Sequence, residues 1–236
     1  MLAVLAPGQG SQTPGFLTPW LESQFASDLL SSWSNAINLD LKRLGTTADG
    51  DEIRDTANAQ PLLVAGGLVG AGALFAGDGS AISYFAGHSV GEITAAALAQ
   101  VFDGASAMKL VRARGLAMAQ AANGTETGMS AVLGGERDEV ISALTELGLT
   151  AANENGAGQI VAAGSLAALT KLTENPPAGA RVRPLAVSGA FHTSTMAPAV
   201  TELALIATRT EVKDVVQPVI SNKDGAVVSE GREILD

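Results

Sequence analysis

The chain has 236 residues, of which 47% are hydrophobic and 16% are charged, and its formal net charge is −10. This apolar content can build a buried core and excludes a disordered chain. The acidic balance leaves no surplus of Lys and Arg, so we expect neither nucleic acid nor an anionic membrane surface as a partner. The absence of cysteine excludes disulfides and thiolate sites, and two histidines are too few for a multi-histidine metal site.

The first 123 residues are predicted to alternate between strands and helices. A buried strand is expected at 2–6, before a Gly-rich polar loop at 8–12. Surface helices are expected within 17–45, a polar helix at 51–59, and an apolar helix over 62–75 that Gln60 and Pro61 open. A strand at 81–86 and helices at about 90–99 and 104–121 complete this part.

No targeting or membrane segment is predicted. The N-terminal residues 1–8 lack a basic region, and the apolar run at 62–77 is shorter than a spanning helix and is interrupted by glycines. We therefore expect a cytoplasmic protein.

The pattern changes after Asn123. Strands are predicted at 129–133, 150–153, 159–163 and 181–187, with helices at 136–147 and 166–173. This β-α-β-β-α-β order is typical of a ferredoxin-like unit. We predict an inserted subdomain at 124–190 between two parts of an α/β core, 1–123 and 191–236. The second part is expected to hold a helix at 197–209, a strand at 217–221, a turn at 222–225 and the start of a helix at 229–236.

The segment FAGHSVGEI, residues 85–93, contains the pattern G-x-S-x-G between the predicted strand and the next helix. This is the context of a nucleophile elbow, in which glycines permit a sharp turn and the serine oxygen is exposed. Ser89 is therefore a candidate nucleophile. The alternative is an ordinary strand-to-helix turn in which Ser89 caps the helix.

A serine nucleophile needs a base. His88 adjoins Ser89 on a tight turn, where neighbouring side chains point apart, and a structural role is favoured for it. His192 is the only other imidazole and lies where the insertion is expected to return to the core. We therefore predict His192 as the base.

Two further features suit an acyl-transfer site. The Val90 amide follows the nucleophile and can donate to an oxyanion, and the loop at 8–10 is placed to supply a second amide. Arg114 interrupts an apolar stripe formed by Ala107, Leu110 and Met118 on the predicted helix at 104–121. An inward guanidinium needs a partner, which is either a structural carboxylate or the carboxylate of a substrate.

Five segments occur together: GQGSQ at 8–12, QP at 60–61, GHSVGE at 87–92, RG at 114–115 and GAFH at 189–192. In this order and spacing they resemble the malonyl-CoA:acyl carrier protein transacylases of bacterial fatty-acid synthesis, to which acyltransferase domains of polyketide synthases are related. The resemblance implies an α/β-hydrolase-like core with a parallel sheet and a ferredoxin-like (βαββαβ) insertion.

The resemblance also implies a mechanism and its residues. Ser89 takes the malonyl group from malonyl-CoA, His192 acts as base and acid, and the phosphopantetheine thiol of acyl carrier protein collects the group in a ping-pong reaction. No cofactor is implied, and a monomer is expected. The oxyanion hole is formed by the amides of Gln9 and Val90, and the substrate is bound by Arg114, Met118, Phe191 and Asn155.

Members of this family usually continue for several dozen residues beyond 236, so the resemblance implies a chain that is truncated at its C-terminus. The part beyond includes the carbonyl that orients the histidine. Two other functions stay open: a serine esterase or thioesterase, and a non-catalytic remnant that binds carrier protein. Docking of an acidic carrier would use exposed cations such as Lys171, Arg181 and Arg183.

Overall fold

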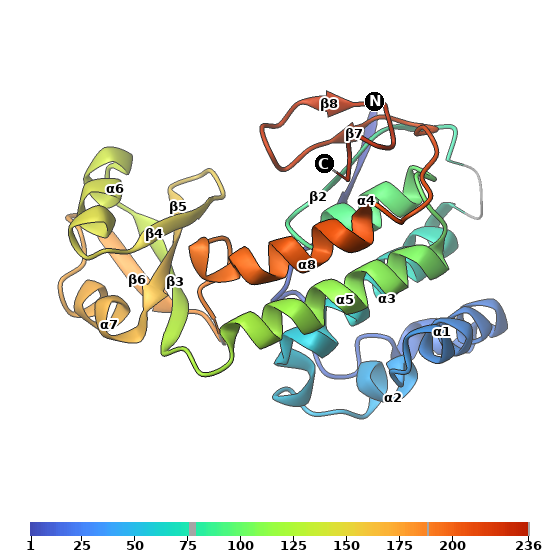
Figure 1. The fold of residues 1–236 in the computed structure, drawn as a ribbon, viewed down its shortest axis with the longest axis horizontal. Coiled ribbons are helices and arrows are strands. Elements are labelled where there is room, and N and C mark those ends of the chain that lie inside the picture. The colour runs from blue at the N-terminus through green and yellow to red at the C-terminus, as the bar shows by residue number, and fades with distance from the viewer. Residues whose placement is uncertain (76–78, 188, 236) are drawn as a thin grey trace. The chain divides into compact units, whose positions relative to one another are not determined.

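The computed structural model describes residues 1–75, 79–187 and 189–235. Contacts divide the chain into two compact units (Figure 1). The first unit comprises Met1–Leu116 and Glu202–Asp236, and the second unit comprises Ala117–Thr201. The second unit extends beyond the predicted insertion at both ends, because Ala117, Met118 and Ala199 belong to its apolar core. The assignment of 124–190 as an inserted subdomain stays a prediction.

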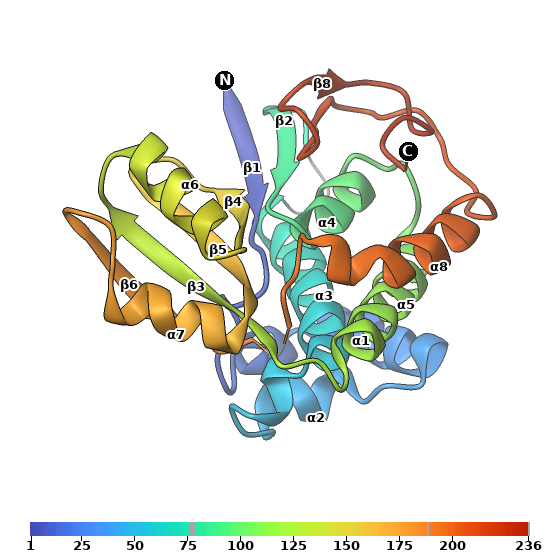
Figure 2. The ribbon, with the colours of Figure 1, turned by 60° about the vertical axis from the view of Figure 1, so that its left-hand side comes forward.

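The first unit contains a four-stranded sheet in the order β1-β2-β7-β8. Its strands are β1 (Leu2–Ala6), β2 (Ile82–Gly87), β7 (Val219–Ile220) and β8 (Val227–Val228). β2 pairs in parallel with β1 and with β7, which confirms the predicted parallel sheet, whereas β8 is antiparallel to β7. β8 was not predicted, because two residues are too few to show a strand periodicity. The carboxyl ends of β1 and β2 lie side by side, with Ala6 opposite Gly87 (Figure 2).

Helices of the first unit follow the predicted order. They are η1 (Thr18–Glu22), α1 (Gln24–Ile37), α2 (Leu41–Thr46), η2 (Glu52–Arg54), α3 (Thr56–Phe75) and α4 (Gly91–Leu98), while α5 (Gly104–Ala122) and α8 (Ala197–Ala207) extend across the boundary between the units. α1 is amphipathic: Leu30, Trp33 and Ile37 are buried at helical spacing. Ser23 caps α1 by accepting the amide of Ala26.

The start of α3 was predicted wrongly. The helix begins at Thr56 and contains Pro61, whereas a separate polar helix at 51–59 and a new start at 62 were expected. Proline provides no N–H for the carbonyl four residues earlier, which is that of Ala57. The guanidinium of Arg112 on α5 donates to that carbonyl at 2.6 Å instead. The carbonyl that proline leaves unpaired therefore has a partner, and the helix continues through Pro61.

This longer α3 also changes the expectation that the apolar run is too short to span a membrane. With 20 residues and a mean hydropathy of 1.3, α3 is the one helix in the described residues that is long and apolar enough to cross a membrane by length and composition. Core helices pass the same test. Here Leu62, Val64 and Ala65 are buried within the core of the first unit. Residues 76 and 77 of the predicted run lie outside the described residues.

The second unit has the predicted β-α-β-β-α-β order. Its elements are β3 (Thr127–Gly134), α6 (Arg137–Glu146), β4 (Thr150–Glu154), β5 (Gln159–Ser165), α7 (Leu166–Glu174) and β6 (Ala180–Pro184), followed by η3 (Ser194–Met196). The strands form a sheet in the order β4-β5-β3-β6, in which all neighbours are antiparallel. β6 ends earlier than predicted, at Pro184. The amide of Leu185 still donates to the carbonyl of Met129, but the amide of Val187 donates to the carbonyl of Leu185 in its own segment.

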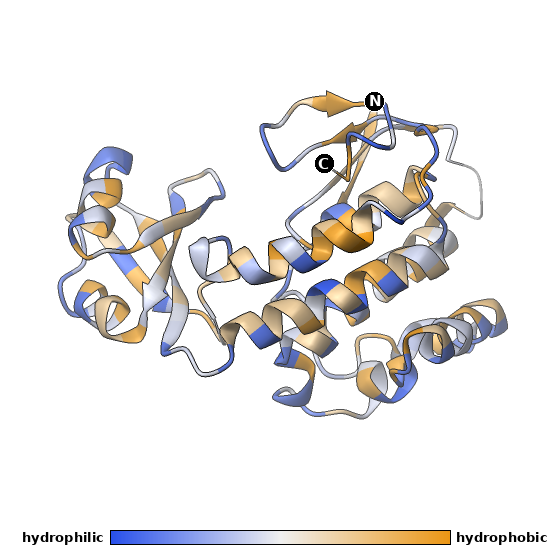
Figure 3. Ribbon diagram, in the orientation of Figure 1, coloured by the Kyte–Doolittle hydropathy of each residue, from blue (hydrophilic) through white to orange (hydrophobic). Residues whose placement is uncertain are grey.

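The sheet of the second unit is apolar on both faces. Along β5, Ile160 and Ala162 pack with side chains of α6 and α7, whereas Val161 and Ala163 belong to a different cluster. This alternation follows from the two-residue period of a strand. α6 and α7 cover one face of the sheet (Figure 2), and both show hydrophilic residues beside hydrophobic ones, as amphipathic helices do (Figure 3).

The last residues do not begin a helix, contrary to the prediction for 229–236. Residues 231–235 form turns, and Asp236 lies outside the described residues. A Cβ on Gly231 would lie 1.9 Å from the carbonyl oxygen of Lys213, so the backbone packs closely there. Arg232 donates to the carbonyl of Ala207, the last residue of α8, and to that of Thr210 just beyond it. These tertiary contacts fix the segment in turns.

Candidate active site

The G-x-S-x-G segment forms a sharp turn between β2 and α4. Ser89 has a φ of 52°, in the left-handed region that a non-glycine residue rarely adopts. A Cβ on Gly87 would lie 2.0 Å from the carbonyl carbon of Gly91, and a Cβ on Gly91 would lie 2.3 Å from the carbonyl oxygen of Ala6. Both positions therefore require glycine, because any side chain would collide with backbone. The turn has the geometry of a nucleophile elbow.

Ser89 does not cap α4, so the alternative prediction for this residue is wrong. The N-cap position is Val90, and no side chain caps it. The Ser89 hydroxyl instead accepts a hydrogen bond from Nη2 of Arg114 at 3.3 Å. The hydroxyl thus lies beside a cation.

Arg114 occupies the predicted place in the apolar stripe of α5, where Ala107, Leu110 and Met118 are buried. Its Nη1 donates to Oε1 of Gln60 at 2.7 Å. Burial lowers the pKa of Arg114 to about 10, and the negative charge of Glu92 opposes that shift. The guanidinium is therefore still charged at neutral pH. Among the residues that the structure describes, Arg114 forms no salt bridge, so the structural ion pair considered above is absent there.

Gln60 is a site residue whose role was not predicted. Its side chain is only 1% exposed, and its amide oxygen holds the guanidinium that reaches Ser89. A neutral amide orients the cation without neutralising it, so the charge stays available to an anionic ligand. The signal in the sequence was a polar residue at the start of a long apolar run, which was interpreted as a helix start and as part of one of the five family segments, with no role assigned to its side chain.

The loop after β1 lies against the elbow. A Cβ on Gly8 would lie 2.6 Å from Nδ1 of His88, and the side chain of Gln9 donates to the Thr56 hydroxyl at 3.2 Å. Within the described part of the chain, the backbone N–H groups of Gln9 and Val90 donate to no protein acceptor. Two unengaged amides on segments that meet at one edge of the sheet suit an oxyanion.

His88 and His192 differ in their surroundings. The backbone amide of His88 donates to the Ala6 carbonyl at 2.9 Å, which fixes the turn. His192 lies in the second unit, is exposed, and has a φ of 57°. Thr193 follows it and caps η3 by accepting the amide of Thr195. The backbone at His192 is therefore held in an unusual conformation, as at Ser89.

The remaining predicted residues of the second unit separate into two groups. Met118 and Phe191 are buried in one apolar cluster, so the structure brings these two together. Asn155 is exposed in the turn between β4 and β5, where its Nδ2 donates to Oε1 of Gln159 at 2.9 Å.

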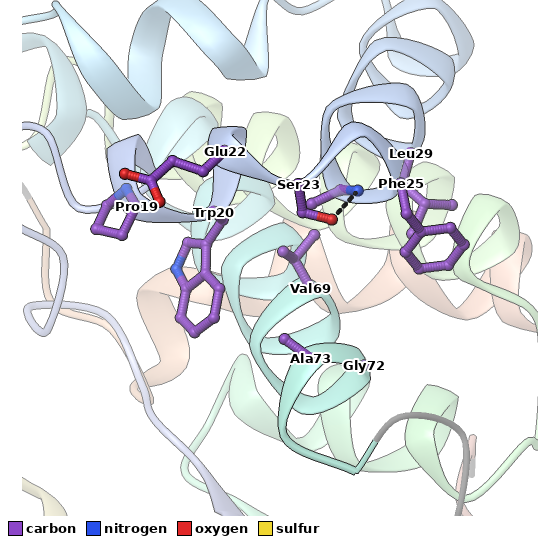
Figure 4. Close-up of a pocket in the computed structure, with 10 residues that line it drawn as sticks. Pro19, Trp20, Glu22, Ser23, Phe25, Leu29, Val69, Gly72 and Ala73 are labelled. Carbon is purple, nitrogen blue, oxygen red and sulfur yellow. Dashed lines mark hydrogen bonds between the residues drawn. The ribbon is translucent and has the colours of Figure 1, made fainter.

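A separate groove of about 390 Å³ lies on the first unit between η1, α1 and α3 (Figure 4). Its lining is mainly apolar, with Trp20, Phe25 and Val69 among its side chains, and Glu22 is the one charged residue among the described residues that line it. These described residues include neither a basic group for an anionic substrate nor any predicted site residue. No group of three or more His, Asp and Glu side chains that could hold a metal occurs in the described residues.

Comparison with known proteins gives consistent matches. The acyl transferase domain family model matches residues 5–230. The malonyl CoA-acyl carrier protein transacylase of Mycobacterium tuberculosis is 51% identical over 241 aligned positions, which cover 100% of this chain and 79% of that relative. The relative from Bacillus subtilis with the same name is 33% identical, with 99% and 76% covered.

Solved structures agree with these sequence matches. The crystal structure of MCAT from Mycobacterium tuberculosis has a TM-score of 0.92 at 50% identity, covering 99% of this chain and 78% of that one. A type II PKS acyl-carrier protein in complex with its malonyl-transacylase, PlMCAT:AntF, contains a similar chain with a TM-score of 0.92 at 30% identity and the same coverage.

Proposed function

The chain belongs to the acyl transferase domain family, and on this premise we propose that Ser89 carries the acyl group during transfer. The activity is that of an acyltransferase, which moves a malonyl group from malonyl-CoA to acyl carrier protein. The observation that supports Ser89 most directly is its place on the elbow: a left-handed backbone between two obligatory glycines, with its hydroxyl bonded to Arg114.

The reaction has two halves. In the first, Ser89 Oγ attacks the thioester carbonyl of malonyl-CoA, an ester C–O bond forms, the C–S bond breaks, and CoA leaves as a thiol. In the second, the phosphopantetheine thiol of the carrier attacks that ester and Oγ regains a proton. His192 takes the proton from Oγ and delivers it to the leaving sulfur, and then reverses these roles.

Two features of the site explain how the malonyl group is transferred and bound. The Gln9 and Val90 amides stabilise the oxyanion of each tetrahedral intermediate, and each such donor contributes about 2.7–4 kcal/mol to lowering the barrier. Arg114 pairs with the free carboxylate of the malonyl group, because its charged guanidinium is oriented by Gln60 and reaches Ser89 Oγ. Met118, Phe191 and Asn155 are the further substrate-binding residues of this proposal.

The carrier protein is the second substrate. The PlMCAT:AntF complex shows a malonyl-transacylase of similar fold bound to an acyl-carrier protein, which supports the same class of partner here. We also propose a monomer, with no nucleic acid and no membrane as partners, from the acidic composition. A cytoplasmic location is proposed from the expectation that the N-terminal residues form no targeting segment.

A serine esterase or thioesterase is not favoured. Water would then take the acyl group, and such an enzyme has no use for a charged guanidinium beside the nucleophile. A non-catalytic carrier-binding remnant is not favoured either, because the strained elbow and the two unengaged amides have no role in binding alone.

Intact-protein mass spectrometry after brief incubation with malonyl-CoA tests this proposal. A mass increase of one malonyl group is expected in the parent chain and not in Ser89→Ala, because the alanine variant lacks the attacking oxygen. Circular dichroism of both proteins checks that they are folded. Equal labelling of a folded Ser89→Ala variant would contradict the role of Ser89.

A further inference from the structure

One residue outside the motifs holds the elbow in place. Asn222 lies two residues after β7, and its Oδ1 accepts the backbone N–H of Ser89 at 3.0 Å. Its Nδ2 donates to the carbonyl of Gly87. The backbone N–H of Asn222 donates to Oε1 of Glu92 at 2.8 Å. Asn222 therefore contacts the elbow at the end of β2, at the nucleophile and in the first turn of α4.

These contacts act on the strained part of the turn. A left-handed φ at a non-glycine residue persists only where surrounding interactions hold it. The side chain of Asn222 bonds two backbone groups on the N-terminal side of that dihedral, the amide of Ser89 itself and the carbonyl of Gly87. On the C-terminal side, the backbone N–H of Asn222 bonds the side chain of Glu92. An amide side chain is suited to this task, since it offers one acceptor and donors at the same time.

The contact with Asn222 also determines which backbone N–H groups of the elbow can donate to an oxyanion. The Ser89 N–H is engaged by Asn222 and so does not compete for an oxyanion, whereas the next amide, that of Val90, has no protein acceptor among the described residues. We propose that Asn222 is a positioning residue for acyl transfer, which holds Ser89 in its reactive conformation and keeps the Val90 amide as the oxyanion donor. This inference rests on the proposed role of Ser89.

Asn222 is exposed, so its loss opens no cavity. A positioning role therefore predicts a specific kinetic defect: Asn222→Ala should lower the maximal rate of Ser89 malonylation roughly tenfold to a hundredfold, because small misplacements of reacting groups have effects of that size. The concentration of malonyl-CoA at half-maximal rate should change less than threefold, since Arg114 and its partner Gln60 are untouched.

The experiment is rapid-quench intact-mass measurement over a range of malonyl-CoA concentrations, with final extent of labelling and thermal midpoint recorded for each protein. The matched control is Asn35→Ala, the same substitution at an exposed position on α1. A slowed rate with a parent-like final extent and midpoint supports the inference. A rate equal to that of Asn35→Ala overturns the inference. A lowered final extent also overturns it if the fraction that is labelled reacts as fast as the unmodified protein, because the substitution has then inactivated some molecules without slowing the others.

Labelling of the unmodified (parent) protein shows whether a negative result counts against this inference or against the proposed function. If the parent is labelled and Asn222→Ala behaves like the control, only the inference fails. If the folded parent is not labelled, the role of Ser89 fails first. Should Asn222→Ala not fold, Asn222→Leu is judged by the same criteria, because it keeps the size of the side chain but has neither the oxygen that accepts from Ser89 nor the N–H that donates to Gly87.

Discussion

Ser89 and Arg114 are joined by a hydrogen bond from a guanidinium to a hydroxyl, at 3.3 Å. A hydroxyl beside a cation is more readily ionised, because the positive charge stabilises the developing alkoxide. The same cation is the proposed partner of the malonyl carboxylate. One residue can thus favour both the attack and the choice of a malonyl group over an uncharged acyl group.

At the residue scale, Arg114→Ala is predicted to remove the preference for malonyl over acetyl thioesters. Loss of a partly buried charge partner costs about 2–5 kcal/mol, so kcat/KM for malonyl-CoA should fall roughly thirtyfold or more. The value for acetyl-CoA should fall much less, because no carboxylate is present. Parallel assays with the two thioesters measure this ratio.

The contrast variant for this prediction is Gln60→Ala. It keeps the charge of Arg114 but removes the oxygen that accepts from Nη1. We expect a smaller loss of the preference, since the cation is present but less well oriented. Unchanged discrimination in Arg114→Ala would refute its pairing with the malonyl carboxylate.

At the scale of elements, α3 and α5 are linked by a hydrogen bond from the side chain of Arg112 to the backbone carbonyl of Ala57. Pro61 deprives Ala57 of its helical hydrogen bond, and Arg112 supplies a replacement at 2.6 Å. A buried or half-buried carbonyl without a partner costs about 1–3 kcal/mol. The elements that carry Gln60 and Arg114 are therefore held together next to the site.

A double-mutant cycle between Pro61 and Arg112 tests this dependence. Arg112→Met, which keeps most of the apolar stem, should lower the free energy of unfolding by about 1–3 kcal/mol. Its effect should be smaller in a Pro61→Ala background, because alanine restores the N–H that can bond Ala57.

Urea denaturation followed by tryptophan fluorescence measures each corner of this cycle. The two tryptophans, Trp20 and Trp33, both lie in the first unit, so the signal reports the unit that contains the contact. Lys109→Met, at an exposed position of α5, is the control and should show no coupling to Pro61. Strict additivity of Arg112→Met and Pro61→Ala would show that the replacement bond contributes nothing.

At the scale of the whole molecule, the net charge of −10 disfavours contact with an acidic partner, unless cations gather locally. The second unit exposes Lys171 on α7 together with Arg181 and Arg183 on β6. These three are the predicted docking cations for the carrier. Electrostatic complementarity of this kind mainly raises association rates and is screened by salt.

Reversal of all three charges to Glu is predicted to weaken transfer to the carrier by about tenfold or more at low salt, with a smaller effect at high salt. Malonylation of Ser89 by malonyl-CoA should be unchanged, because that half-reaction needs no carrier. The two half-reactions are measured separately by intact mass.

The matched control for charge reversal changes Lys109, Arg209 and Lys213 to Glu, which alters net charge equally at exposed positions of the first unit. If both triple variants transfer malonyl to the carrier equally well, the predicted docking surface is wrong.

Local sequence determined much of the molecule. The strand–turn–helix at 82–98 could be predicted because glycine on both sides of Ser89 and apolar runs around it act within a few residues. The strands of the second unit could be predicted for the same reason, since most of them are short apolar runs bounded by turn residues. The apolar stripe of α5 and the place of Arg114 in it followed from helical periodicity.

Only the tertiary structure decided the partners of these residues. Gln60 and Arg114 are 54 positions apart and Ser89 and Asn222 are 133 apart, so no periodicity connects them. Pro61 was misjudged because the group that replaces its missing hydrogen bond comes from another helix. Periodicity reveals that a side chain or a carbonyl must be satisfied. Which distant group satisfies it depends on how the chain packs.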